Sequence, residues 1–185
     1  MRKVVSGLFI SLDGVVESPE KWQFSWDEEM AASLAKTLDN SDALLLGRVT
    51  YEMWAGYWPS YTGEGDAGFA DWINNSPKYV VSHTLDNVDA WQNSHLIKGD
   101  LAAAVKRLKE GEGKNISVAG SPGLVASLLE QDLLDGLELM INPVVAGGGR
   151  KKLFPADAAL RKLELVSAEP TSSGVIIASY RPVRP

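Results

Sequence analysis

The sequence contains no cysteine and only two histidines, His83 and His95. The absence of cysteine excludes disulfide bonds, cysteine-ligated zinc, iron–sulfur clusters and thiol nucleophiles. Two histidines are too few for a three-histidine metal site, and a Ser-His-Asp triad would have to use one of them. We therefore expect no metal centre, and any reaction to depend on a bound organic cofactor.

Long apolar runs and an excess of positive charge are also missing. No run approaches the roughly 18 apolar residues that a membrane span needs, and no targeting segment follows Arg2 and Lys3. The net charge of −6 disfavours nucleic acid and anionic membranes as partners. It does not exclude a phosphorylated ligand, because donors within about 8–10 Å set that affinity. We expect a cytoplasmic protein that binds a small molecule.

The composition is typical of a globular protein. The chain has 185 residues, of which 45% are hydrophobic and 23% are charged. At roughly 150 residues per domain, this predicts one domain over residues 1–185.

Short β-rich apolar runs alternate with segments of helical periodicity. We expect strands at residues 3–11, 43–47, 78–82, 94–97, 115–119, 137–142, 163–169 and 175–181. We expect helices after the capping-box pair Ser25 and Glu28, over 50–58 and 66–73, after Asp100, and after Ser121. This order predicts a three-layer α/β/α fold with a mostly parallel central sheet and an antiparallel C-terminal edge hairpin.

Three strand ends carry small and polar residues of the kind that hold phosphates. They are 47–50 (GRVT), 82–84 (SHT) and 120–123 (GSPG). In a parallel sheet these ends meet at the edge where ligands bind, and helix N-termini there offer free N–H groups. Taken alone, each glycine turn favours a purely steric role and residues 82–84 favour a solvated turn, and none matches a GxGxxG or Walker A pattern. Their shared place at one sheet edge is what favours a phosphate site.

Five segments occur in an order that is typical of one family. They are 11–14 (SLDG), 45–52 (LLGRVTYE), 76–82 (SPKYVVS), 119–124 (AGSPGL) and 143–154, which begins PVVAGGG and ends LF. On these segments the chain resembles the dihydrofolate reductase-like superfamily, in the branch similar to the C-terminal reductase domain of bacterial riboflavin biosynthesis proteins. The segments span nearly the whole chain.

The resemblance implies NADPH-dependent reduction. It implies cofactor contacts, to the pyrophosphate, the 2′-phosphate and the adenosine ribose, from Gly47, Arg48, Thr50, Ser82, His83, Thr84, Gly120, Ser121, Gly123 and Leu124. It also implies a homodimer, to which residues 175–178 would contribute unless that strand is buried within the monomer.

The resemblance also suggests residues for the substrate. Asp13 matches the aspartate of the family that faces the substrate, and Asp27 lies near the substrate-binding acid of dihydrofolate reductases. The alternative role for Asp13 is that of a turn residue, and the alternative for Asp27 is that of a helix-capping group. Asn142 is a candidate hydrogen-bonding residue for a heterocycle, or else it starts a turn. Trp26 and Trp58, with Trp22, are candidates for an aromatic wall, or else they are packing residues.

We therefore predict a reductase that uses NADPH on a small, pteridine- or pyrimidine-like heterocycle. The nearest activities are 5-amino-6-(5-phosphoribosylamino)uracil reductase and dihydrofolate reductase. Residues 15–22 lack the polar substrate-phosphate segment of the former, which leaves the pathway open. The alternative is a non-catalytic NADPH-binding sensor or dimerisation module. A hydrolase using Ser121 is disfavoured, because Pro122 follows it and no G-x-S-x-G motif is present.

Overall fold

An eight-stranded mixed sheet forms the middle layer of the protein in a computed structural model, which describes residues 1–184. The strand order is β4-β3-β2-β5-β1-β6-β8-β7. The six strands from β4 to β6 pair in parallel, and β8 pairs antiparallel with β6 and with β7. The strands are β1 Val4–Ser11, β2 Ser41–Gly47, β3 Lys78–Val81, β4 Ser94–Ile97, β5 Asn115–Ala119, β6 Gly136–Asn142, β7 Leu163–Pro170 and β8 Ile176–Pro182.

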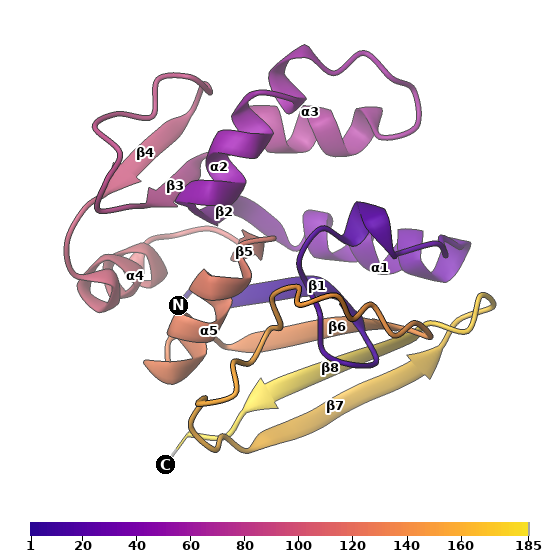
Figure 1. Cartoon of the computed structure of the whole chain (residues 1–185). Helices are drawn as coiled ribbons and strands as arrows, with labels where there is room; N and C mark the ends of the chain where they lie inside the picture. Colours follow the sequence, from indigo (N-terminus) through magenta and orange to yellow (C-terminus); the bar gives the residue numbers. More distant parts are fainter. Residues whose placement is uncertain (185) are drawn as a thin grey trace.

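Helices cover both faces of this sheet (Figure 1). Side chains of α4 and α5 pack on one face, and side chains of α1, α2 and α3 pack on the other. None of the described helices has the length and apolarity required to cross a membrane. The helices are α1 Glu28–Asp39, α2 Arg48–Ala55, α3 Ala67–Asn75, α4 Leu101–Glu110 and α5 Pro122–Glu130, with 3-10 turns η1 Pro19–Lys21 and η2 Trp58–Ser60.

Both faces of the central strands are apolar, as a parallel sheet covered on two sides requires. In β1, Leu8 and Ile10 point into the core under α4 and α5, whereas Phe9 packs toward Met30 of α1. The period of two along the strand produces this division. The expected fold class is therefore confirmed: helices lie on both faces of a mostly parallel sheet that ends in an antiparallel hairpin.

Two element boundaries differ from the expected ones for physical reasons. The predicted capping box of Ser25 and Glu28 is wrong, because Asp27 is the N-cap of α1 and its carboxylate accepts a hydrogen bond from the Met30 N–H at 2.8 Å. Helix α2 runs over Arg48–Ala55 instead of residues 50–58. It stops before Gly56, and Pro59 belongs to the separate turn η2.

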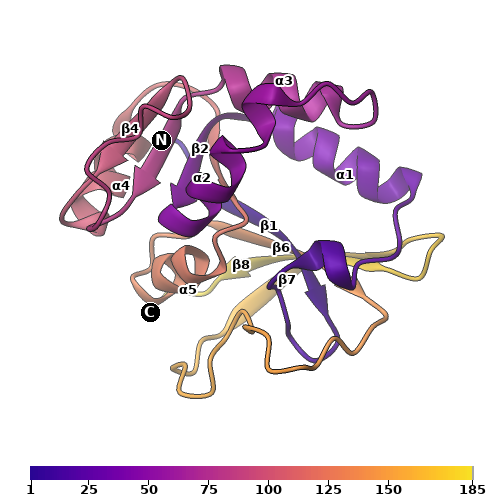
Figure 2. The same cartoon turned by 45° about the horizontal axis from the view of Figure 1, so that its top comes forward.

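The C-terminal hairpin places its two strands differently. Strand β8 lies between β6 and β7, so Val175 and Ala178 are buried within the monomer. The outermost strand is β7, at the end of the sheet opposite β4 (Figure 2). It exposes Leu165 and Val166. Residues 175–178 are therefore partly buried within the monomer, while Ile176 stays 43% exposed.

Candidate functional site

The starts of α2 and α5 are fastened to each other at the carboxyl edge of the sheet. The Gly47 N–H donates to Ser121 Oγ at 2.9 Å, and the Ser121 N–H donates to Thr50 Oγ1 at 3.0 Å. We call Gly47, Thr50, Gly120 and Ser121 the α2–α5 junction. These reciprocal bonds hold two of the three predicted phosphate-binding turns side by side, as the parallel topology requires.

Glycine is required at position 120. Its backbone has φ +53°, and a Cβ atom there would lie 3.2 Å from Thr50 Cγ2. Side chains rarely adopt this left-handed conformation, and a Cβ atom could be accommodated only if Thr50 shifted. The close approach of Gly120 to Thr50 therefore keeps the turn between β5 and α5 tight.

The junction changes the roles expected for two hydroxyl residues. Ser121 occupies the N-cap position of α5, but its side chain makes no capping bond, because its hydroxyl accepts from Gly47 instead. Thr50 is buried, and its hydroxyl oxygen accepts the Ser121 N–H. Their main contribution is to join the two turns, so the donors toward an anion come from the backbone.

Both helix starts remain suited to an anionic ligand. Gly47 caps α2 with extended backbone and no side-chain hydrogen bond, and α5 likewise lacks a side-chain cap. Uncapped N–H groups and the helix dipole favour negative charge at these positions.

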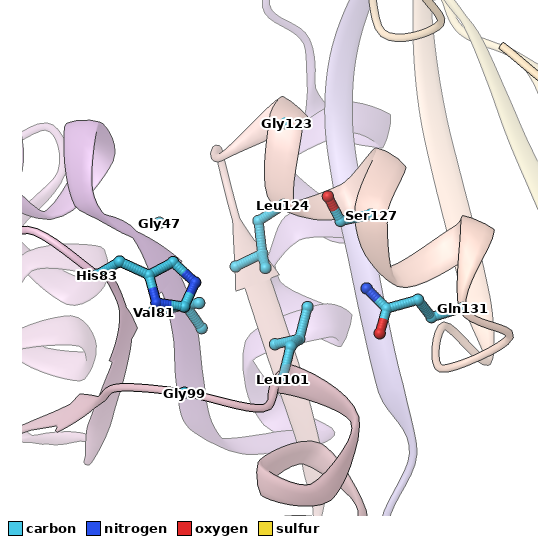
Figure 3. A pocket seen from close by; sticks show the side chains of 9 residues that line it. All are labelled: Gly47, Val81, His83, Gly99, Leu101, Gly123, Leu124, Ser127 and Gln131. Carbon is cyan, nitrogen blue, oxygen red and sulfur yellow. The ribbon is translucent and has the colours of Figure 1, made fainter.

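A cavity of about 480 Å³ adjoins the junction between the end of β3 and the helices α4 and α5 (Figure 3). His83 points into it from one side, and Ser127 of α5 and Gln131, the C-cap of α5, line the opposite side. A volume of this size is typical of small-ligand sites. The lining residues are Gly47, Val81, His83, Gly99, Leu101, Gly123, Leu124, Ser127 and Gln131.

Four of these residues are predicted cofactor contacts: Gly47, His83, Gly123 and Leu124. Gly99 and Leu101 were missed, although they flank a fourth strand-to-helix junction, between β4 and α4, that meets the same criterion as the other three. Ser127 and Gln131 were also missed. They follow Leu124 at spacings of three and four residues, which places all three along one side of the helix, and that spacing was visible in the sequence.

Two glycines leave the cavity open. A Cβ atom built on Gly123 would meet nothing within 4 Å, and the same holds for Gly99. Side chains at these positions would therefore project into open space, and glycine keeps that space available to a ligand. The donor-rich helix starts and the glycine-lined cavity together fit a dinucleotide phosphate.

The remaining predicted cofactor residues lie beside the cavity. Ser82 is buried, and its hydroxyl accepts from the N–H groups of Thr84 at 3.1 Å and Leu85 at 3.0 Å. It therefore closes the turn that presents His83. Arg48 is half exposed at the first position of α2 and pairs with Glu52 at 2.6 Å.

Asp13 lies at the end of β1 and holds the glycine-rich loop that follows β6. Its carboxylate accepts from Ser11 Oγ at 2.6 Å and from the N–H groups of Ala146 and Gly147, each at 2.9 Å. These hydrogen bonds, with Ser11 first, lower the pKa of Asp13 to about 2. An ionised carboxylate cannot donate a proton at neutral pH, so the geometry favours a positioning role.

Asp27 joins the N-terminus of α1 to the β7–β8 turn. Burial raises its pKa, but hydrogen bonds from Ser173, Thr171 and the Met30 N–H outweigh burial and hold the pKa below its usual range. The Ser173 hydroxyl donates to Asp27 Oδ2 at 2.5 Å. The alternative of a helix-capping group is confirmed by its bond to Met30, and the lowered pKa disfavours Asp27 as a proton donor.

The tryptophans lie in separate surroundings. Trp22 is buried, and Trp58 packs with Trp54 and Phe69 in the core under α2 and α3. Trp26 is 52% exposed and meets the edge of Phe9 with ring centroids 6.2 Å apart. Of the three, Trp26 alone is well exposed at the β1 side of the sheet.

Comparison with known proteins agrees with this architecture. YyaP of Bacillus subtilis (strain 168), an uncharacterised protein, is 29% identical over 184 residues, which cover 97% of this chain and 94% of YyaP. A crystal structure of a protein from Shewanella sp. PV-4 that was assigned to riboflavin biosynthesis has a TM-score of 0.78 at 19% identity, covering 98% of this chain and 99% of that one. The riboflavin biosynthesis reductase Rib7 of Saccharomyces cerevisiae has a TM-score of 0.63 at 15% identity, covering 98% and 90%.

The sheet order and these neighbours define a dihydrofolate reductase-like α/β fold, of the kind found in riboflavin-biosynthesis-like reductases. Residues 2–177 match the family model of the RibD C-terminal domain. The chain belongs to the RibD C-terminal domain family.

Proposed function

We propose that this protein is an NADPH-dependent reductase of a small heterocyclic substrate. The observation that carries the proposal is the glycine-lined cavity beside the paired starts of α2 and α5. The cavity supplies space for the adenosine half of a dinucleotide, and the helix starts supply N–H donors for its pyrophosphate.

Arg48 is the residue that would contact the adenosine 2′-phosphate. It stands at the start of α2, and its ion pair with Glu52 is half exposed. An exposed i,i+4 pair contributes little, so the guanidinium is able to turn to a phosphate, with which it forms bidentate bonds.

The bound cofactor would supply a hydride to the substrate, and the protein positions the two molecules. Asp13 and Asp27 are both held ionised, so we infer that the proton reaches the product from water. Asp13 fixes the loop after β6 at the substrate side, and Trp26 offers a ring face beside Phe9 for a flat substrate.

The Arg48→Ala variant tests the cofactor assignment. Affinity for NADPH is expected to fall by about 1.5–3 kcal/mol, with little change for NADH, because NADH lacks the 2′-phosphate. Calorimetric titration measures both. Arg181→Ala is the matched control, since Arg181 also pairs with a glutamate at 2.6 Å but lies on β8. Equal losses for both cofactors, or no NADPH binding by the wild-type protein, would contradict the assignment.

The second candidate is a non-catalytic NADPH-binding module. The ionised state of both candidate acids favours it, because neither is prepared to donate a proton. NADPH oxidation measured against pterin, pyrimidine and quinone substrates separates the two candidates. Binding without turnover on any of them would select the module.

We also propose a homodimer in which β7 faces the partner. An edge strand presents unpaired N–H and C=O groups, and this one exposes Leu165 and Val166. Sedimentation of the purified chain measures the oligomeric state. Cytoplasmic location and the absence of nucleic-acid or membrane partners remain predictions from the sequence.

A further inference from the structure

Asn142 is the last residue of β6, and its side-chain amide has a hydrogen-bond partner for the nitrogen but none for the oxygen. The side chain is 1% exposed, and its Nδ2 donates to the Met140 carbonyl at 2.9 Å. Reversing the amide would place oxygen against oxygen, so the contact fixes which atom is which. Oδ1 is buried and has no hydrogen-bond partner among residues 1–184.

The donors on the adjoining residues of β1 and of the loop after β6 are committed elsewhere. Ser11 is opposite Asn142 in the β1–β6 register, but its hydroxyl donates to Asp13 at 2.6 Å. The Leu12 N–H donates to Val144 O at 2.8 Å, and the Val144 N–H donates to the backbone carbonyl of Asn142 at 2.7 Å. A buried acceptor without a partner is costly, and folded proteins rarely keep one without a ligand, an ion or a water molecule to fill it.

The position of Asn142 points to a ligand that has an aromatic ring. Strand periodicity puts Asn142 on the same face as Met140, and Met140 pairs in register with Phe9. The exposed ring of Trp26 packs against Phe9. The unpaired oxygen thus belongs to a residue on the same face of the sheet as Phe9, one pleat further toward the carboxyl edge.

We propose that Asn142 determines substrate specificity by accepting a hydrogen bond, through Oδ1, from an N–H group of a neutral nitrogen heterocycle. This assignment rests on the proposed reductase function only in placing the substrate at the β1–β6 end of the sheet edge. The acceptor is an uncharged amide, which favours a neutral partner over a cation. A ligand that offers only acceptors, such as a quinone, leaves Oδ1 unpaired.

The test compares 2,4-diaminopyrimidine with 2,4-dimethylpyrimidine, which has nearly the same shape and no N–H group. Binding to the full chain is measured by calorimetry with and without saturating NADPH. The wild-type protein is expected to bind the diamino probe at least about 10-fold more tightly. Asn142→Leu is expected to weaken that probe by about 10- to 100-fold and to remove the preference.

Ser41→Ala is the matched control, because Ser41 also has a buried hydroxyl without a partner but lies at the start of β2, on the opposite edge of the sheet. It should keep the preference. Asn142→Ala serves as the second variant if Asn142→Leu does not fold, as judged by its denaturation midpoint.

Three outcomes would overturn the assignment: no binding of either probe, equal binding of both by the wild type, or a preference retained in the Asn142 variants. Equal binding is also what a water molecule resident on Oδ1 would produce. NADPH affinity, measured on the same proteins, reports separately on the proposed reductase function.

Discussion

Two parts of the same sheet edge differ in which polar groups are hydrogen-bonded within the protein. At the α2–α5 junction, side-chain hydroxyls pair with backbone N–H groups, and the helix starts beside them present donors to an open cavity. At the β1–β6 end, formed by Ser11, Asp13, Asn142 and the loop they hold, a carboxylate takes the backbone donors and one acceptor is left over.

If both proposals hold, this difference suits one edge to two kinds of ligand. Backbone donors at helix starts suit an anionic cofactor, because the helix dipole adds to the hydrogen bonds. A neutral acceptor beside an aromatic ring suits an uncharged N–H group instead. The chain separates the two sites along a continuous set of parallel strands, β3-β2-β5-β1-β6.

The largest expected effect on the junction comes from Gly120→Val. A β-branched side chain at φ +53° is strained, and its Cβ would crowd Thr50 Cγ2 at 3.2 Å. We expect a loss of about 3 kcal/mol in the free energy of unfolding, measured by urea denaturation. Gly123→Val is the control, since it meets no neighbour. It should leave stability unchanged and weaken NADPH binding by filling the cavity. Equal stability losses would contradict the distinction.

A medium effect is expected from breaking the reciprocal bonds one at a time. Thr50→Val leaves the buried Ser121 N–H unpaired, and Ser121→Ala leaves the Gly47 N–H unpaired. Each should cost about 1–2 kcal/mol of unfolding free energy. The double variant should cost less than the sum of the two, because both bonds maintain one junction. Strict additivity in this cycle would show that the two turns are held independently.

The smallest effect at neutral pH is expected from Asp13→Asn at the β1–β6 end, since the amide keeps one acceptor oxygen. The folded-state pKa of Asp13 is about 2, below its usual 3.8, so its contribution to stability is present above pH 4 and is lost as the pH falls toward 2. The wild-type advantage in thermal midpoint over Asp13→Asn should therefore shrink between pH 5 and pH 2, to an extent that the pKa difference sets. Asp86→Asn, with a fully exposed carboxylate, is the control. A pH-independent difference would show that Asp13 is not held ionised by its partners.

Much of the fold followed from local patterns. The helix start at Asp100 was predicted, and its carboxylate accepts from the Ala103 N–H at 3.1 Å. The position of Pro122 at the start of α5 was also predicted from its preference for the first helical turn. The first helix was harder, because Ser25 and Asp27 are both good caps. The contact that helps fix Asp27 comes from Ser173, which is 146 residues away in sequence.

For the candidate site too, some features follow from the local sequence and others from the tertiary structure. The sequence by itself determined the alternation of strands and helices along the chain, the glycine turns and the resemblance to the family, because these depend on short-range patterns. Only the tertiary structure decided that Ser121 and Thr50 join two turns, that Asp13 and Asp27 are ionised, and that Asn142 keeps an open oxygen. Hydrogen-bond partners such as Gly47 and Ser121 are 74 residues apart, so no local signal reveals which groups are paired and which remain available to a ligand.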